Sequence, residues 1–236
     1  MHVCWLLLFV GFLSCLVFTK GDIQVVLLNK FKLRYAGFST LVNMSESNSS
    51  SWSLVISCFD PIPETIDDVF IVPDIGSILT ESITPKTLTN KIIWPNGVVS
   101  ANILAKNSLI VPSGFLVPGK TKGNLYFLNG TTPISLVPQE DTHWFYHDAD
   151  FKDVNMDGFM DVVAGRANVP VKAERAQTQL IWLKNPGKQE ITSPWELHIL
   201  KETDGPDIDV QFARIDNTQV REKIYSIYVN SVGSIC

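Results

Sequence analysis

Cysteine is scarce in this chain, and two of its four cysteines, Cys4 and Cys15, lie near the N-terminus. The other two, Cys58 and Cys236, can form one disulfide at most, so a disulfide-dense scaffold is excluded. The sequence leaves open whether these two pair. Because Cys58 stands in an apolar run, we expect a buried strand residue rather than a reactive thiol.

The chain also lacks a basic tract. Its 19 Lys and Arg residues are outnumbered by 24 Asp and Glu residues, which gives a formal net charge of −5. Binding to nucleic acid depends on clustered positive charge, so nucleic acid is not an expected partner. With 45% hydrophobic residues, the chain has enough apolar material for a sizeable core.

No segment sustains an apolar stripe of helical period over more than three turns. Short apolar runs separated by Pro, Gly, Asn or Asp are present instead, and they are typical of β-strands. Such a series predicts an all-β fold, either a sandwich or radially repeated sheets such as a propeller. The expected strands cover residues 54–57, 69–73, 109–112, 124–128, 161–164, 179–183, 195–200, 208–213 and 223–229.

A secretory signal peptide is predicted over residues 1–21. Residues 4–18 are almost wholly apolar, and the small and polar residues 19–21 precede Asp22. An apolar run of about 15 residues is shorter than the ~20 that span a bilayer and suits a signal peptide. We therefore expect a secreted, extracellular protein that begins near Asp22, has no membrane partner and carries a net charge of −6 after loss of Lys20. The weakly charged start of the run leaves a short signal anchor as the alternative.

Three Asn-X-Ser/Thr sequons agree with export. Each would place a bulky, hydrated glycan on the protein, so we expect the sequons that are used to lie in exposed loops. The acceptor residues are Asn43, Asn48 and Asn129.

Residues 153–161, Asp-Val-Asn-Met-Asp-Gly-Phe-Met-Asp, form the most specific motif of the chain. Ca²⁺ takes about 6–8 oxygen ligands, and short acidic or amide side chains at alternating positions of a tight turn supply them. Glycine at position 6 allows the chain to fold back with positive φ, so that the carbonyl at position 7 also points at the ion. We therefore predict a Ca²⁺ site whose ligands are Asp153, Asn155, Asp157, Asp161 and the Phe159 carbonyl.

Two loops that begin in the same way are excluded. An EF-hand needs Glu at position 12 and two flanking helices, whereas position 12 here is Ala164 and residues 162–165 form an apolar run that predicts a strand. A dockerin loop also needs an acidic residue at that position. The remaining alternative is a solvated Asp/Asn/Gly turn without a metal.

The loop and its surroundings resemble the FG-GAP/VCBS repeat of integrin-α-type β-propellers. The resemblance rests on the loop, on Asp-Ala-Asp-Phe at 148–151 before it and on the apolar residues 162–164 after it. Residues 179–187 and 195–200 look like the later strands of such a blade. The match covers residues 144–200, which make up the best-defined blade.

In that family the loop joins the first two strands of a blade and binds Ca²⁺. The resemblance implies that residues 22–236 form a β-propeller and that the ion is structural. At roughly 50–60 residues per blade, these residues supply about four blades, whereas propellers of this family usually have about seven. We therefore expect an incomplete propeller, the N-terminal portion of a longer one. A minimal four-bladed ring is the alternative.

A second copy of the loop is expected to be degenerate. Residues 214–222 fall into the same frame as the loop, 61 residues further on. Arg214 replaces the first carboxylate and Gln219 replaces the glycine, which would put a cation beside the ion and strain the turn. We expect no metal there, and chance alignment explains the match as well as repetition does.

The sequence favours a binding function over a catalytic one. The favoured function is an extracellular interaction module whose ligand is a protein or a glycan. The alternative is a propeller enzyme acting on carbohydrate, similar to lyases and dehydratases, with the His143 to Asp150 segment in its cleft and His147 and Asp148 as catalytic candidates. These two residues enter an expected strand beside a structural ion, where a hydrogen-bonded histidine is more common than a catalytic one. The chain also has no GxSxG, HExxH, P-loop or Rossmann motif. A stable secreted fold without present activity also stays open.

Overall fold

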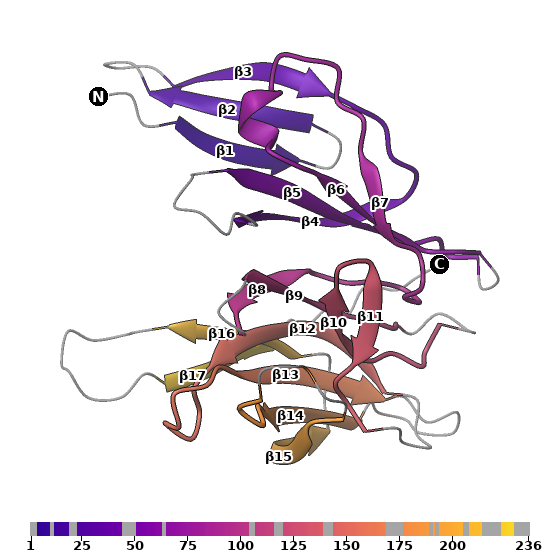
Figure 1. The fold of residues 1–236 in the computed structure, drawn as a ribbon, viewed down its shortest axis with the longest axis vertical. Helices are drawn as coiled ribbons and strands as arrows, with labels where there is room; N and C mark the ends of the chain where they lie inside the picture. Colours follow the sequence, from indigo (N-terminus) through magenta and orange to yellow (C-terminus); the bar gives the residue numbers. More distant parts are fainter. Residues whose placement is uncertain are drawn as a thin grey trace.

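The computed structural model describes residues 4–9, 12–18, 23–43, 51–62, 65–103, 107–115, 120–138, 144–168, 177–188, 191, 194–204, 208–213 and 223–228. Within these ranges the chain forms strands β1 to β17 and one short 3-10 helix, η1 (Ile75–Ser77) (Figure 1). The predicted all-β fold class is therefore confirmed. No helix in the described ranges is long and apolar enough to cross a bilayer.

The first sheet contains three antiparallel strands in the order β1-β2-β3. They are β1 (Cys4–Phe9), β2 (Phe12–Phe18) and β3 (Ile23–Lys30). The side-chain amide of Asn29 in β3 donates a hydrogen bond of 3.0 Å to the Leu79 carbonyl, which follows η1. Strands β1 and β2 lie within the predicted signal peptide, and its cleavage stays a prediction.

Three four-stranded sheets follow, and each is an antiparallel meander in which every strand pairs with the next one along the chain. Sheet I contains β4 (Ala36–Asn43), β5 (Trp52–Cys58), β6 (Asp68–Val72) and β7 (Lys86–Thr89). Sheet II contains β8 (Val99–Asn102), β9 (Asn107–Pro112), β10 (Leu125–Asn129) and β11 (Thr132–Ser135). Sheet III contains β12 (Phe145–Lys152), β13 (Asp161–Asn168), β14 (Gln177–Lys184) and β15 (Glu196–Asp204). Strands β16 (Ile208–Ala213) and β17 (Lys223–Tyr228) form a further pair.

The sheets stack on one another in chain order, and β9 shows how. Successive side chains of a strand point to opposite faces. Leu109 and Val111 pack in a buried cluster with Val55 of sheet I. Ile110, between them, packs in a different cluster with Val162 of sheet III. Sheet II is therefore buried between its two neighbours.

Sheet III is covered on both faces as well. All eight residues of β13 are buried. Val162 and Ala164 belong to the cluster shared with sheet II, whereas Val163 packs with Val210 of β16 on the other side. The sequence of a strand that is buried on both faces is a continuous apolar run. For this reason the sequence predicts the start of β13 correctly.

The first strands of successive sheets are neighbours. Strand β4 contacts β8, β8 contacts β12, and β12 contacts β16. None of the sheets in the described ranges closes on itself.

Asn96, in the connection between β7 and β8, is fully buried and joins all three sheets. Its backbone carbonyl accepts a hydrogen bond of 2.7 Å from the Ser57 hydroxyl of sheet I. Its side-chain amide donates to the Gly114 carbonyl beside sheet II at 2.9 Å and to the Tyr146 carbonyl of sheet III at 2.7 Å. One side chain therefore fixes the relative positions of sheets II and III.

Every strand expected from the sequence is present. Eight other strands of the described ranges lie outside the expected ranges. Strands β1 and β2 fall in the run interpreted as a signal peptide, and β3 and β12 are also not among those ranges. The remaining four are short or rich in Gly, Ser, Thr, Lys and Asn: β4, β7, β8 and β11. Residues 214–222, which contain the expected degenerate loop, lie outside the described ranges.

Candidate metal-binding loop and adjoining groove

The predicted metal loop connects β12 to β13, the first two strands of sheet III (Figure 1). Lys152 and Asp161 form the last register pair of these strands. The two ends of the loop, Asp153 and Asp161, are thereby held close together.

Asp161 anchors the loop from a fully buried position, with 0% of its surface exposed. One carboxylate oxygen accepts the Val154 N–H at 3.0 Å, and the other accepts the Asn185 N–H at 2.8 Å. Asn185 belongs to the connection between β14 and β15. Asp161 therefore joins the metal loop to a second connection at the same end of sheet III.

The turn of the loop is organised by Asp153. Its two carboxylate oxygens accept the N–H groups of Asp157 at 3.0 Å and Gly158 at 2.9 Å. Gly158 has a φ of 90°, in the left-handed region that glycine adopts without strain. The glycine thus has the role that the sequence predicts for position 6.

Asp157 is exposed at the tip of the loop. Its carboxylate accepts the Phe159 N–H at 3.0 Å and the Asn155 side-chain amide at 2.7 Å. The hydrogen bond from Phe159, followed by that from Asn155, lowers the pKa of Asp157 below its ordinary value. The carboxylate is therefore ionised at neutral pH, as a metal ligand must be.

The donor chemistry of the loop fits Ca²⁺. All the predicted ligands are oxygen atoms, which suits a hard cation, and an ionised carboxylate has about four lone-pair sites, so accepting an N–H leaves room for an ion. The acidic side chains are nevertheless turned toward backbone donors. In the part of the chain that the structure describes, no three or more His, Cys, Asp or Glu side chains are grouped to hold a metal.

A groove of about 380 Å³ adjoins the loop. Asp157 and Phe159 of the loop line one side, and Asn185, Lys188 and Glu196 are among the residues opposite. Asn185 fixes the distance between the two sides, because its side-chain amide donates to the Met160 carbonyl at 2.9 Å while its backbone binds Asp161. From the sequence, residues 185–187 are predicted only as the end of a strand, and no local signal indicates this groove.

The alternative catalytic residues, His147 and Asp148, lie at an irregularity of the β12–β13 pairing. The His147 ring packs edge-on against Phe38 of sheet I, with centroids 5.6 Å apart, and lies 6.2 Å from Phe115 beside sheet II. Six strand residues span roughly 20 Å, so His147 is well separated from Asp153. The structure does not bring the two predicted sites together, and His143 lies outside the described ranges.

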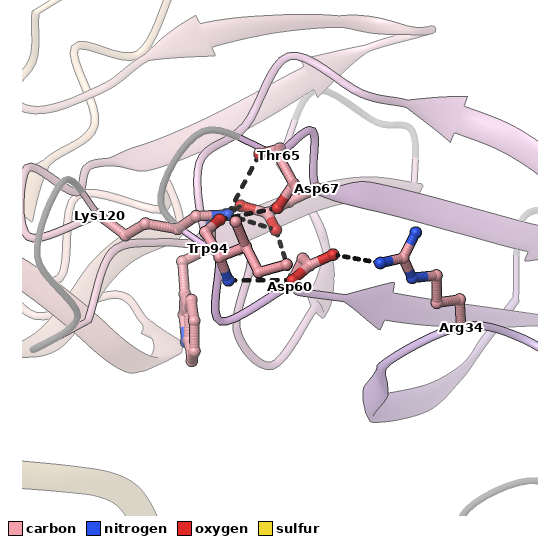
Figure 2. A network of polar contacts seen from close by, with 7 residues as sticks. Arg34, Asp60, Thr65, Asp67, Trp94 and Lys120 are labelled. Carbon is pink, nitrogen blue, oxygen red and sulfur yellow. Dashed lines mark hydrogen bonds and ion pairs between the residues drawn. The ribbon is translucent and has the colours of Figure 1, made fainter.

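A buried ion pair that the sequence does not predict connects sheets I and II (Figure 2). Lys120, between β9 and β10, places its ammonium 2.7 and 2.8 Å from the two carboxylate oxygens of Asp67 and 3.2 Å from the Thr65 carbonyl. The backbone N–H of Trp94 donates to the same carboxylate at 2.7 Å. Every donor of the ammonium therefore has an acceptor. No spacing rule links such distant positions, so the sequence carries no signal for the pair.

The network extends to the surface through Asp60. Its N–H donates to Asp67 at 2.7 Å, and its carboxylate lies 3.1 Å from the exposed guanidinium of Arg34 (Figure 2). Asp60 itself is 4% exposed. The ion pair is thus held by two layers of polar partners, which assigns it a structural role between the sheets.

Cys58 is a buried residue of β5, as predicted. Burial first, and the nearby Asp68 carboxylate second, raise the pKa of Cys58 to about 12. The thiol is therefore inert at neutral pH. Cys236 lies outside the described ranges, so its pairing with Cys58 stays open.

The three sequons differ in their surroundings. Asn129 is exposed at the end of β10, before a turn in which Gly130 has a φ of 60°. Asn43 is half-buried at the end of β4, and Asn48 lies outside the described ranges. Asn129 is therefore the most accessible acceptor among the described residues.

Comparison of the sequence with protein-family models and with curated proteins gives no match.

Proposed function

We propose that the chain is a secreted, Ca²⁺-binding β-propeller segment of the FG-GAP/VCBS type that serves as an extracellular interaction or ligand-binding module. Successive four-stranded meanders that pack face to face, with their first strands in contact, support a propeller arrangement. The propeller is incomplete in this proposal, because the three sheets and the β16–β17 pair among the described residues do not close a ring.

The position of the acidic loop carries the proposal. The loop joins the first two strands of sheet III, its glycine adopts positive φ, and its last carboxylate is buried at the start of β13. Asp161 accepts the backbone N–H groups of Val154 and Asn185, so the end of the loop is held in place before any ion binds. Ca²⁺ at this loop would offset the repulsion between Asp153, Asp157 and Asp161 and would hold the ends of β12 and β13 together.

A binding role is favoured over catalysis by the surroundings of His147. The imidazole packs against Phe38 of sheet I and Phe115 beside sheet II, and it lies far from the loop. The groove beside the loop, in contrast, is open to a ligand. The proposed partner is therefore an extracellular protein or glycan that is bound rather than chemically changed.

Calorimetric titration of the mature chain tests the metal site. Ca²⁺ should bind with a dissociation constant of about 10⁻⁴–10⁻³ M, the range of extracellular modules, and more tightly than Mg²⁺ or Zn²⁺. Asp157→Ala should lose this binding. Glu81→Ala, which removes an exposed carboxylate between η1 and β7, is the matched control and should bind normally. Equal Ca²⁺ uptake by Asp157→Ala and the wild type would refute the assignment.

A further inference from the structure

Phe159 forms an aromatic wall of the groove beside the metal loop. Phe159 is 44% exposed, and its ring lies against the backbone of Gly187. A Cβ at Gly187 would come within 2.9 Å of Phe159 Cε2, and the φ of this glycine is 67°, which disfavours any other residue. The sequence thus keeps a flat apolar surface at the groove.

The other walls of the groove carry charges of both signs. Lys184 and Lys188 supply two ammonium groups, and Asp157 and Glu196 supply two carboxylates. Lys184 lies near enough to Asp157 to help lower its pKa, after the larger effects of the Phe159 and Asn155 hydrogen bonds. Three of these residues are exposed and Lys184 is half-buried, so a ligand in the groove can reach each of the four charged groups.

A Ca²⁺ ion at the loop would change the charge of the groove. Asp157 is both a predicted metal ligand and a residue of the groove wall. Once an ion neutralises it, two ammonium groups face the single carboxylate of Glu196. The groove then attracts an anion, whereas without the ion its charges cancel.

The size and chemistry of the groove favour a sugar. A volume of about 380 Å³ lies in the range of small-molecule sites. The apolar face of a sugar ring packs on an aromatic ring such as Phe159. Its hydroxyl groups can donate to Glu196, and a carboxylate on the sugar can pair with Lys188.

We propose that this groove binds an anionic sugar residue of the uronic acid class and that Ca²⁺ at the adjoining loop strengthens the binding. This inference rests on the proposed function, since it names the ligand class of the same module. The coupling runs through Asp157, which contacts both sites, and through Asn185, which holds the groove wall to Asp161.

Binding of a tetrasaccharide of alternating glucuronate and N-acetylglucosamine to the full chain, measured by calorimetry with Ca²⁺ in excess, tests the proposal. A neutral N-acetylglucosamine tetrasaccharide and a short acidic peptide are the comparison probes. Lys188→Ala should weaken binding of the glucuronate probe about tenfold, a loss of roughly 1.4 kcal/mol. Lys91→Ala, which removes an exposed lysine next to sheet I, should leave it unchanged. Chelation of Ca²⁺ should also weaken the binding severalfold.

Equal affinity for the charged and neutral sugars, or unchanged binding by Lys188→Ala, would overturn the inference. Binding of the acidic peptide in place of the sugar would overturn it in favour of a protein partner. Ca²⁺ uptake is measured separately, so the two proposals fail independently. Ca²⁺ uptake without sugar binding refutes only the proposed sugar site in the groove. Sugar binding that depends on Lys188 but not on Ca²⁺ refutes the coupling between the two sites.

Discussion

Lys120 Nζ lies 2.7 Å from Asp67 Oδ2 although the two residues are 53 positions apart, and both side chains are 1% exposed. The pair brings the connection before β6 against the connection between β9 and β10. Buried charges are tolerated only when they are paired and hydrogen-bonded, and this pair meets both conditions.

Removing the cation should therefore destabilise the protein strongly. Lys120→Met should lower the free energy of unfolding by about 3–5 kcal/mol, because Asp67 is left buried and charged without its partner. Urea denaturation followed by tryptophan fluorescence measures the change. Lys91→Met, at an exposed position, should stay within about 0.5 kcal/mol of the wild type. In a double-mutant cycle with Asp67→Asn, purely additive effects would contradict a direct pairing.

Ca²⁺ should raise the melting temperature of the mature chain. An ion present at ~100 times its dissociation constant contributes roughly 2.7 kcal/mol to the folded state, and chelation removes this. Scanning calorimetry with and without chelator measures the difference. Ca²⁺ should raise the melting temperature of Glu81→Ala as much as that of the wild type, and it should not raise that of Asp157→Ala. Identical melting temperatures with ion and with chelator would contradict a structural role for the metal.

Asp161 should matter even without the ion. Asp161→Asn turns one acceptor oxygen into an N–H donor that faces the N–H of Val154 or Asn185. A buried donor without an acceptor costs about 1–3 kcal/mol. Denaturation in the presence of chelator isolates this effect. Asp157→Asn, at the exposed tip, serves as control and should change stability by less than about 0.5 kcal/mol. If Asp161→Asn lowers the free energy of unfolding no more than Asp157→Asn does, the result would argue against a buried Asp161.

Cys58 should resist alkylation in the native state. Because burial and then Asp68 raise the pKa of Cys58 to about 12, hardly any thiolate exists between pH 7 and pH 9. Iodoacetamide labelling of the mature chain with Cys236→Ser should be slow until urea unfolds it. As the pH rises toward 12, the unfolded chain ionises first and stability falls. Rapid labelling of the folded protein would show that the thiol is accessible.

Export from eukaryotic cells should leave an N-terminus within a few residues of Asp22 and a glycan on Asn129. Asn129 is the expected acceptor because it is exposed before a turn. N-terminal sequencing and a shift in gel mobility on deglycosylation, smaller for Asn129→Gln, measure both events. An intact Met1 in the membrane fraction would instead establish the signal anchor.

The sequence predicts those strands whose burial makes them continuous apolar runs. Strands β5 and β13, which are buried along almost their whole length, are found in this way. Strand β4 alternates exposed and half-buried residues and contains Gly, Ser and Thr, so its composition resembles that of a loop. Its strand conformation depends on pairing with β5, which is a tertiary effect.

The loop between β12 and β13 is predictable because its chemistry is local. Asp153, Gly158 and Asp161 belong to one turn, and their spacing alone predicts a tight loop with positive φ at Gly158. Their role as metal ligands stays a prediction. The groove and the Lys120 ion pair are not local. They depend on which connections meet at the end of a sheet or between two sheets, and local spacing in a single sequence does not contain that information.

The hydrogen bonds of Asn96 have a consequence for the way the molecule unfolds. Repeat proteins whose units contact only their neighbours lose structure in steps. Here one buried residue accepts from Ser57, donates to Gly114 and donates to Tyr146, so three sheets share it. If any one sheet detaches, polar groups of the other sheets lose their hydrogen-bond partners. We therefore expect sheets I, II and III to form one cooperative unit that loses its structure in a single transition.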